Sequence, residues 1–157
     1  MSRIIRNLSI LILVFGAVAF LIGVVFMYEG ISKRIWLTDT MKQESITLSS
    51  LGITGSNANQ IIDSAETAQI AGDTVRGHRH GIAPTYSDLL AGGKFDPANP
   101  KDVTYAQAIN LENYLYLGVL SFGVTTIAMA TGGYMIVIAL ALGSIGFVLL
   151  RLAQNLP

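Results

Sequence analysis

The sequence predicts an all-α membrane protein with an N-terminal signal-anchor helix, a mostly helical polar ectodomain and a C-terminal transmembrane helical hairpin, which makes three spans. Three apolar stretches that lack Asp, Glu, Lys, Arg and His support this prediction: residues 8–28, 114–130 and 134–150. Each is about long enough to cross a hydrocarbon core of roughly 30 Å as a helix. The composition agrees, because 13% of the 157 residues are charged, against about 25% in soluble domains.

These stretches divide the chain into an N-terminal transmembrane helix, a polar ectodomain, a transmembrane helical hairpin and a C-terminal tail, at residues 1–28, 29–112, 113–151 and 152–157. Arg3 and Arg6 precede the first span, and residues 17–19 resemble a signal-peptidase site. Because the apolar run continues to Met27, we expect an uncleaved signal anchor, with a cleaved signal peptide as the alternative.

The polar region contains patterns for short elements. Residues 45–48 alternate polar and apolar side chains, which permits one short strand. A helix face of mostly small residues follows and is expected to end near Gly77; its members are Ile61, Ala65, Ala68, Gly72 and Val75. Further along, Thr85 and Asp88 have the spacing of a capping box, and Thr104 is a candidate N-cap for the next helix.

The C-terminal apolar region is predicted to fold back on itself. As one helix, residues 115–150 would be about 54 Å long, well beyond the core of a bilayer. Residues 131–134, Thr-Gly-Gly-Tyr, lie near the middle and predict a tight turn, with one long protruding helix as the alternative.

The basic residues give conflicting signals on orientation. Arg3 and Arg6 favour a cytoplasmic N-terminus, whereas Lys33, Arg34 and Lys42 lie just past the first span and favour the reverse. We expect the N-terminus inside and residues 29–112 outside the cytoplasm, because the first helix usually dominates. Three spans then place Arg151 outside as well, against the positive-inside rule.

Small residues recur on one face of the second and third predicted spans. Such faces let membrane helices pack backbone to backbone. Packing within one subunit and assembly with another chain both remain open; the predicted helix-packing or oligomer-interface residues are Gly118, Ser121, Thr125, Ala128, Gly132, Ala139, Gly143 and Gly146. The first span carries Gly16, Ala19 and Gly23 in a similar pattern.

No catalytic, cofactor or metal site is predicted. The chain has no cysteine, and its zero formal net charge gives no electrostatic footprint for nucleic acid. His78 and His80 flank an arginine, which repels a cation, so we expect a solvated basic loop or one paired with nearby carboxylates. Near the start of the second predicted span, Glu112 fits either anchoring at the interface or a buried polar contact. We expect no enzyme.

The order of segments resembles a group of small, uncharacterised bacterial multipass membrane proteins. The similar motifs are Glu-Ser-Ile-Thr-Leu at 44–48, the helix end at 71–78, Thr-Tyr-Ser-Asp-Leu at 85–89, Asp-Pro at 96–97 and the helix start at 105–110. Such proteins are sometimes labelled aromatic ring-opening dioxygenases, which implies a non-haem iron site. The sequence offers no ligand set for iron, so the resemblance implies topology and no catalytic residues.

The favoured function is therefore a structural or accessory subunit of the bacterial plasma membrane. It is expected to contact the lipid bilayer and to assemble as a homo-oligomer or with other membrane subunits, without nucleic acid. An oligomeric channel lined by Ser121, Thr125 and Thr126 is the alternative, and an ectodomain enzyme is the least favoured class.

Overall fold

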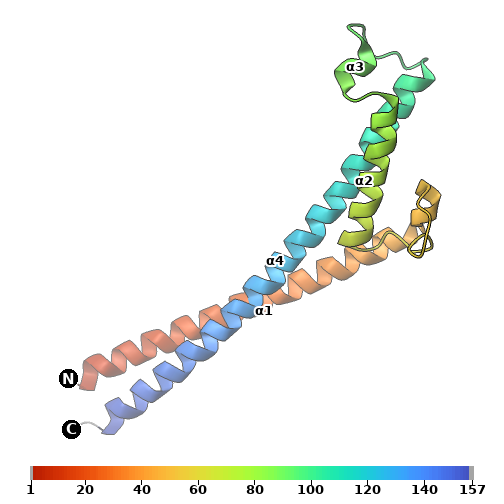
Figure 1. The fold of residues 1–157 in the computed structure, drawn as a ribbon. Coiled ribbons are helices and arrows are strands. Elements are labelled where there is room, and N and C mark those ends of the chain that lie inside the picture. The colour runs from red at the N-terminus through yellow and green to blue at the C-terminus, as the bar shows by residue number, and fades with distance from the viewer. Residues whose placement is uncertain (1, 156–157) are drawn as a thin grey trace. The chain divides into compact units, whose positions relative to one another are not determined.

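The computed structural model describes residues 2–155 and is helical through most of its length (Figure 1). Its elements in chain order are α1 (Ser2–Gln43), the 3₁₀ helix η1 (Leu48–Leu51), α2 (Ala65–Ile82), α3 (Tyr86–Leu90) and α4 (Pro100–Asn155). The chain divides into two compact units. Unit 1 contains residues 2–33 and 124–155, and unit 2 contains residues 34–123.

Two helices of the described chain are long and apolar enough to cross a membrane, Arg3–Gln43 and Pro100–Asn155. The prediction of a C-terminal hairpin is wrong, because α4 continues unbroken through residues 131–134. In lipid a helix satisfies its own backbone hydrogen bonds, so a glycine pair does not have to become a turn there. The three predicted spans thus reduce to two long helices, and α1 continues past the predicted span end at Tyr28 as far as Gln43.

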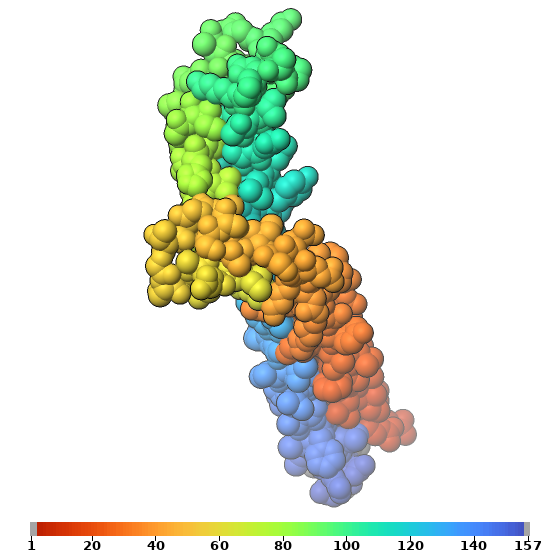
Figure 2. All heavy atoms as spheres, turned by 90° about the vertical axis from the view of Figure 1, so that its right-hand side faces the viewer, coloured from red at the N-terminus to blue at the C-terminus, as the bar shows by residue number. Residues whose placement is uncertain are grey.

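Unit 1 is an antiparallel pair made by the first part of α1 and the last part of α4 (Figure 1). Gly16 lies against Ala139 and Gly143, and nearer the other end of the pair Gly30 lies against Met129. In the space-filling view, α1 (red to orange) and α4 (blue) lie against each other along this unit (Figure 2).

Unit 2 has a small apolar core in which α2 packs on the first part of α4. Its buried residues come from η1, α2, α4 and the loop before α2, and they are Leu48, Ile62, Ala68, Ala71, Val75 and Leu115. A second cluster of Ala83, Leu89 and Tyr105 holds α3. The apolar run that begins at Tyr114 therefore contributes Leu115, near its start, to the core of unit 2.

The local predictions in unit 2 had mixed outcomes. Thr85 caps α3 as expected, and its hydroxyl and the Asp88 carboxylate form both halves of the capping box. Gly77 does not end α2, which continues to Ile82. Thr104 is no cap, because α4 already begins at Pro100. Of the described residues, 45–48 form no strand; Thr47 makes one isolated bridge with Ile61.

Candidate functional site

The helix pair of unit 1 is built on two heptad series of small residues, one on each helix. On α1 the series is Ser9, Gly16, Gly23 and Gly30, and on α4 it is Thr125, Gly132, Ala139, Gly146 and Ala153. All nine residues are buried. A strict seven-residue repeat keeps one helix face toward its partner over many turns. We call these nine residues the small-residue seam.

The seam brings the two backbones into direct contact. A Cβ atom on Gly132 would lie 2.7 Å from the carbonyl oxygen of Gly23 and 2.7 Å from the backbone nitrogen of Met27. A Cβ atom on Gly23 would lie 2.9 Å from the carbonyl oxygen of Gly132. These separations are too short for any real Cβ atom, so glycine is required at both positions. Small residues give membrane helices this close approach.

The polar member of the α1 series does not leave an unpaired group inside the seam. Ser9 is fully buried, and its hydroxyl donates a 2.7 Å hydrogen bond to the carbonyl oxygen of Ile5 on the same helix. A buried hydroxyl without such a partner would destabilise the pair. The seam therefore contains no unsatisfied side-chain polar atom among the described residues.

The eight interface residues predicted from sequence divide between three environments. Thr125, Gly132, Ala139 and Gly146 belong to the seam and are buried in unit 1. Gly143 and Ala128 are partly buried in the same unit. In unit 2, Gly118 is buried beside Met41 and Ala68, and Ser121 is exposed, with its hydroxyl bonded to the carbonyl oxygen of Leu117.

Sequence reasoning missed Ser9, Gly30 and Ala153 as seam residues. They lie seven residues from Gly16, Gly23 and Gly146, respectively, and a pattern of three- and four-residue steps does not reveal this spacing. The Gly132-Gly133 pair was interpreted as a turn, whereas Gly132 lies in close contact with the backbone of Gly23 and Met27 on α1.

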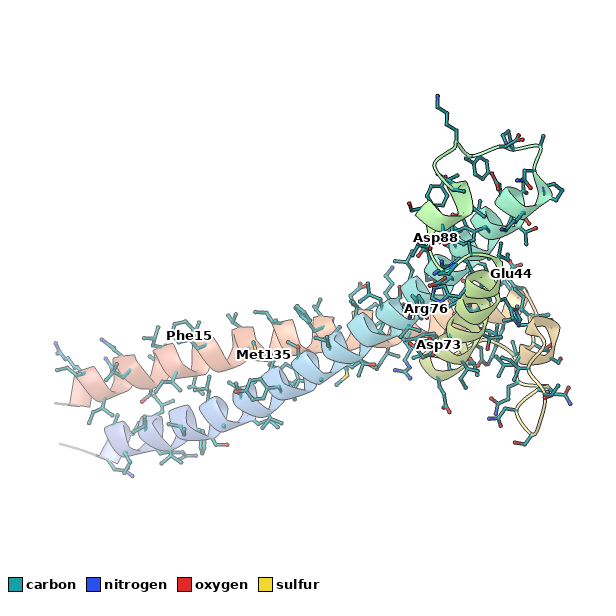
Figure 3. The ribbon with its side chains drawn as sticks, turned by 45° about the horizontal axis from the view of Figure 1, so that its top comes forward. Phe15, Glu44, Asp73, Arg76, Asp88 and Met135 are labelled. Atoms are coloured by element: carbon teal, nitrogen blue, oxygen red, sulfur yellow. The ribbon has the colours of Figure 1, made fainter. Side chains whose placement is uncertain are left out.

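The outer surface of unit 1 is made of large apolar side chains, drawn as sticks in Figure 3. Phe15, for example, is 57% exposed and Val137 is 63% exposed. A water-soluble helix pair buries its large apolar residues, whereas this unit buries glycine, alanine, serine and threonine and exposes the large ones. Other exposed members include Leu11, Val14, Val18, Leu21, Val25, Ile127, Leu140, Ile145, Phe147 and Val148.

Unit 2 contains a buried ion pair between α2 and α4. The Arg79 guanidinium donates from Nε to Glu112 at 2.7 Å and from Nη1 to the Tyr105 hydroxyl at 2.6 Å. Arg79 is 8% exposed and Glu112 is 7% exposed. The hydrogen bond to Glu112 raises the pKa of Arg79 above its ordinary value, although burial acts in the opposite direction. Glu112 therefore makes a buried contact, the second of the two alternatives that the sequence left open.

A more exposed polar network lies on the same pair of helices. Asp73 accepts hydrogen bonds from the Gln69 amide at 3.0 and 3.1 Å and from the Tyr116 hydroxyl at 2.7 Å. These bonds, first that of Gln69 and then that of Tyr116, lower the pKa of Asp73 below its ordinary value. Asp73 and Arg76 are labelled on α2 in Figure 3.

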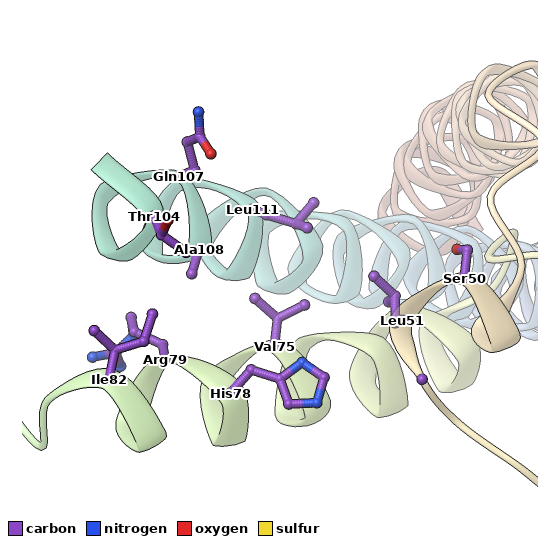
Figure 4. A pocket seen from close by; sticks show the side chains of 11 residues that line it. Ser50, Leu51, Val75, His78, Arg79, Ile82, Thr104, Gln107, Ala108 and Leu111 are labelled. Atoms are coloured by element: carbon purple, nitrogen blue, oxygen red, sulfur yellow. The ribbon is translucent and has the colours of Figure 1, made fainter. Parts of the chain in front are cut away.

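One hollow of unit 2 lies between η1, α2 and α4 (Figure 4). It has a volume of about 460 Å³, and Val75, Ala108 and Leu111 give it an apolar lining. Arg79 contributes to its wall, but its guanidinium already bonds Glu112, Tyr105 and His80. The two lining hydroxyls are occupied by backbone contacts: Ser50 donates to the carbonyl oxygen of Thr47 and Thr104 to that of Pro100.

The two histidines lie on α2 and not in the loop that the sequence suggested. Residues two apart on a helix do not face each other, so His78 and His80 do not converge on one ion. The His80 ring lies 3.2 Å from the Arg79 guanidinium. Within the described part of the chain, no group of three or more His, Cys, Asp or Glu residues is placed to hold a metal.

No family model, curated protein or solved structure matches this chain. The case for function therefore depends on the two units themselves.

Proposed function

We propose that the chain is a two-span integral membrane protein of the bacterial plasma membrane that anchors the polar unit 2 and serves as a structural or accessory subunit. The observation that carries this proposal is the reversed packing of unit 1, with glycine and alanine inside and large aliphatic and aromatic residues outside. Water would oppose such an exterior, whereas lipid is as apolar as the exterior itself.

Two spans also remove a conflict in the charge distribution. Because α1 and α4 are antiparallel in unit 1, Arg151 comes to the same side of the membrane as Arg3 and Arg6. The three-span topology placed Arg151 on the opposite side from them. The proposed orientation has this arginine-bearing side in the cytoplasm and residues 34–123 outside. Arg3, Arg6 and Arg151 then agree with the positive-inside rule, whereas Lys33, Arg34 and Lys42 at the outer end count against it.

The two-span topology also accounts for the length of the apolar run 114–150. Its first residues lie in unit 2, where Leu115 and Phe122 are buried. The rest lies in unit 1 and pairs with the apolar part of α1. About 20 residues are enough to cross the bilayer, so the run need not be membrane-spanning throughout.

The small-residue seam is buried between α1 and α4 of the same chain. Assembly with another chain therefore requires a different surface. In unit 2 a stripe of α4 made of Asn113, Leu117 and Leu120 is exposed, and its two leucines are 54% and 61% exposed. Leu115, two residues before Leu117, lies in the core. This outer stripe is the proposed contact with a second copy or another membrane subunit.

The channel alternative receives less support from the side chains that it requires. Thr125 is buried in the seam, and Ser121 bonds to the backbone of its own helix. Ser121 and Thr126 are exposed whereas Thr125 is buried, so the three side chains do not line one common surface, and we do not propose this function.

Topology is tested by cysteine labelling in intact cells, since the chain has no cysteine of its own. A cysteine at Ser50 should react with a membrane-impermeant thiol reagent, and one at Gln154 should react only after lysis. Labelling of both positions in intact cells would contradict the two-span topology. Labelling of Gln154 alone would reverse the orientation.

Assembly is tested by the mass of the detergent-solubilised particle, with co-purifying chains identified. Leu117→Asn combined with Leu120→Asn should lower that mass to one chain plus detergent. The control Leu111→Asn, elsewhere on the same helix, should leave the mass unchanged. A wild-type particle that already has the mass of one chain would refute assembly and leave the membrane anchor standing.

A further inference from the structure

Three arginines lie at one end of the unit 1 helix pair. The packing fixes their level: Leu13 lies against Gly146, and one heptad further along each helix come Arg6 and Ala153. Ala153 is 8% exposed, so the helices remain paired to this point. Arg151 is two residues from Ala153, about 3 Å along the helix axis. Arg3 lies one turn beyond Arg6. We call Arg3, Arg6 and Arg151 the basic end.

Within the part of the chain that the structure describes, no acidic side chain pairs with the basic end. All ten acidic residues of the sequence lie between residues 29 and 112. Among the described residues, none of the three arginines makes an ion pair. Arg151 is exposed, and its guanidinium carbon lies 5.4 Å from the centre of the Phe147 ring. Arg3 and Arg6 are also exposed. All three positive charges are therefore available to an external anion.

The length of the apolar segment sets the depth of these charges in a bilayer. Residues 8–28 of α1 span about 31 Å as a helix, which matches the hydrocarbon core. Arg6 lies two residues beyond this segment, and Arg151 directly follows Leu150 at the end of the apolar run of α4. Arginine side chains at such positions extend toward the interface, so their guanidinium groups reach the layer of lipid phosphates.

We infer that the basic end binds the phosphate groups of anionic phospholipids in the leaflet that surrounds it. This inference rests on the proposed membrane-spanning function. The guanidinium group presents a planar fork of donors that matches phosphate oxygens in pairs, and it keeps its charge at every physiological pH. An anionic lipid is favoured over a zwitterionic one, because no Asp or Glu side chain of the described residues lies near these three positive charges.

The test is native mass spectrometry of the full chain in non-ionic detergent, titrated with phosphatidylglycerol or phosphatidylcholine of the same acyl composition. The wild-type chain should bind phosphatidylglycerol more tightly. Each arginine contributes about five-fold to this preference. Arg6→Gln combined with Arg151→Gln should reduce it about 25-fold. The charge-matched control, Lys94→Gln with Lys101→Gln in unit 2, should leave it unchanged.

Three outcomes would overturn the inference. They are equal binding of the two lipids by the wild-type chain, an equal loss in the lysine control, and full competition by inorganic phosphate, which would indicate a site for free phosphate. Failure of the proposed function looks different. In that case the chain would remain monodisperse in buffer without detergent and would not co-float with vesicles of either lipid.

Discussion

Gly132→Ala is the sharpest test of the small-residue seam. The added Cβ atom would lie 2.7 Å from backbone atoms of Gly23 and Met27, which is about 0.7 Å short of the 3.4 Å at which ordinary contact begins. Backbone atoms cannot rotate away as a side chain can, so the helices must separate. A gap of 0.5–1 Å removes roughly a quarter to a half of the dispersion attraction of each affected atom pair.

Gly143→Ala is the matched control, because it lies on the same helix and a Cβ atom there meets nothing within 4 Å. Both substitutions gain about 1 kcal/mol of helix propensity. Only Gly132→Ala adds the cost of overpacking, about 1–3 kcal/mol. The propensity gain cancels in the comparison, so the Gly132 variant should be less stable than the Gly143 variant by about 1–3 kcal/mol.

Thermal unfolding in a fixed detergent measures this difference. For a chain of this size, 1 kcal/mol corresponds to about 2–4 °C in Tm, so the two variants should differ by several degrees. Gly143→Ala should match or exceed the wild-type Tm. Equal Tm values for the two variants, or a higher value for Gly132→Ala, would refute the close backbone contact between α1 and α4.

Three further predictions concern unit 2. Glu112→Gln leaves the buried Arg79 charge without its counter-ion and should lower the free energy of unfolding by about 3–5 kcal/mol in urea titrations. Replacing both Glu112 and Arg79 with apolar residues should lower it much less. Equal losses of unfolding free energy in the single and double variants would contradict the buried pair. Because the folded-state pKa of Asp73 is lowered, its contribution is present above the ordinary value of 3.8 and is lost as pH falls below it; Asp73→Asn should therefore lower Tm at pH 7 and converge with wild type near pH 2. Thr85→Ala should destabilise α3 by about 1 kcal/mol through loss of its N-cap, and hydrogen exchange should show this as faster amide exchange in residues 86–90. The control Thr104→Ala, inside α4, should leave the exchange of residues 86–90 unchanged.

The distribution of apolar and charged residues was enough to predict the class of the fold. Long stretches without charge predict membrane helices, and α1 and α4 are the two helices with that character. The local capping box at Thr85 was also predictable, because its partners lie three residues apart and need no tertiary contact. Most of the small residues that form the seam could be recognised in the sequence, but the sequence did not show which helix they pack against.

Tertiary contacts decided the role of residues 131–134. Gly132 and Gly133 have the composition of a turn, and only the approach of α1 shows that Gly132 is required for close helix packing. The buried Arg79–Glu112 pair joins residues 33 positions apart, so neither side chain reveals its partner locally. Backbone propensity and hydropathy are properties of single segments. The division of residues 114–150 between unit 2 and unit 1 depends instead on which other segment lies beside each part.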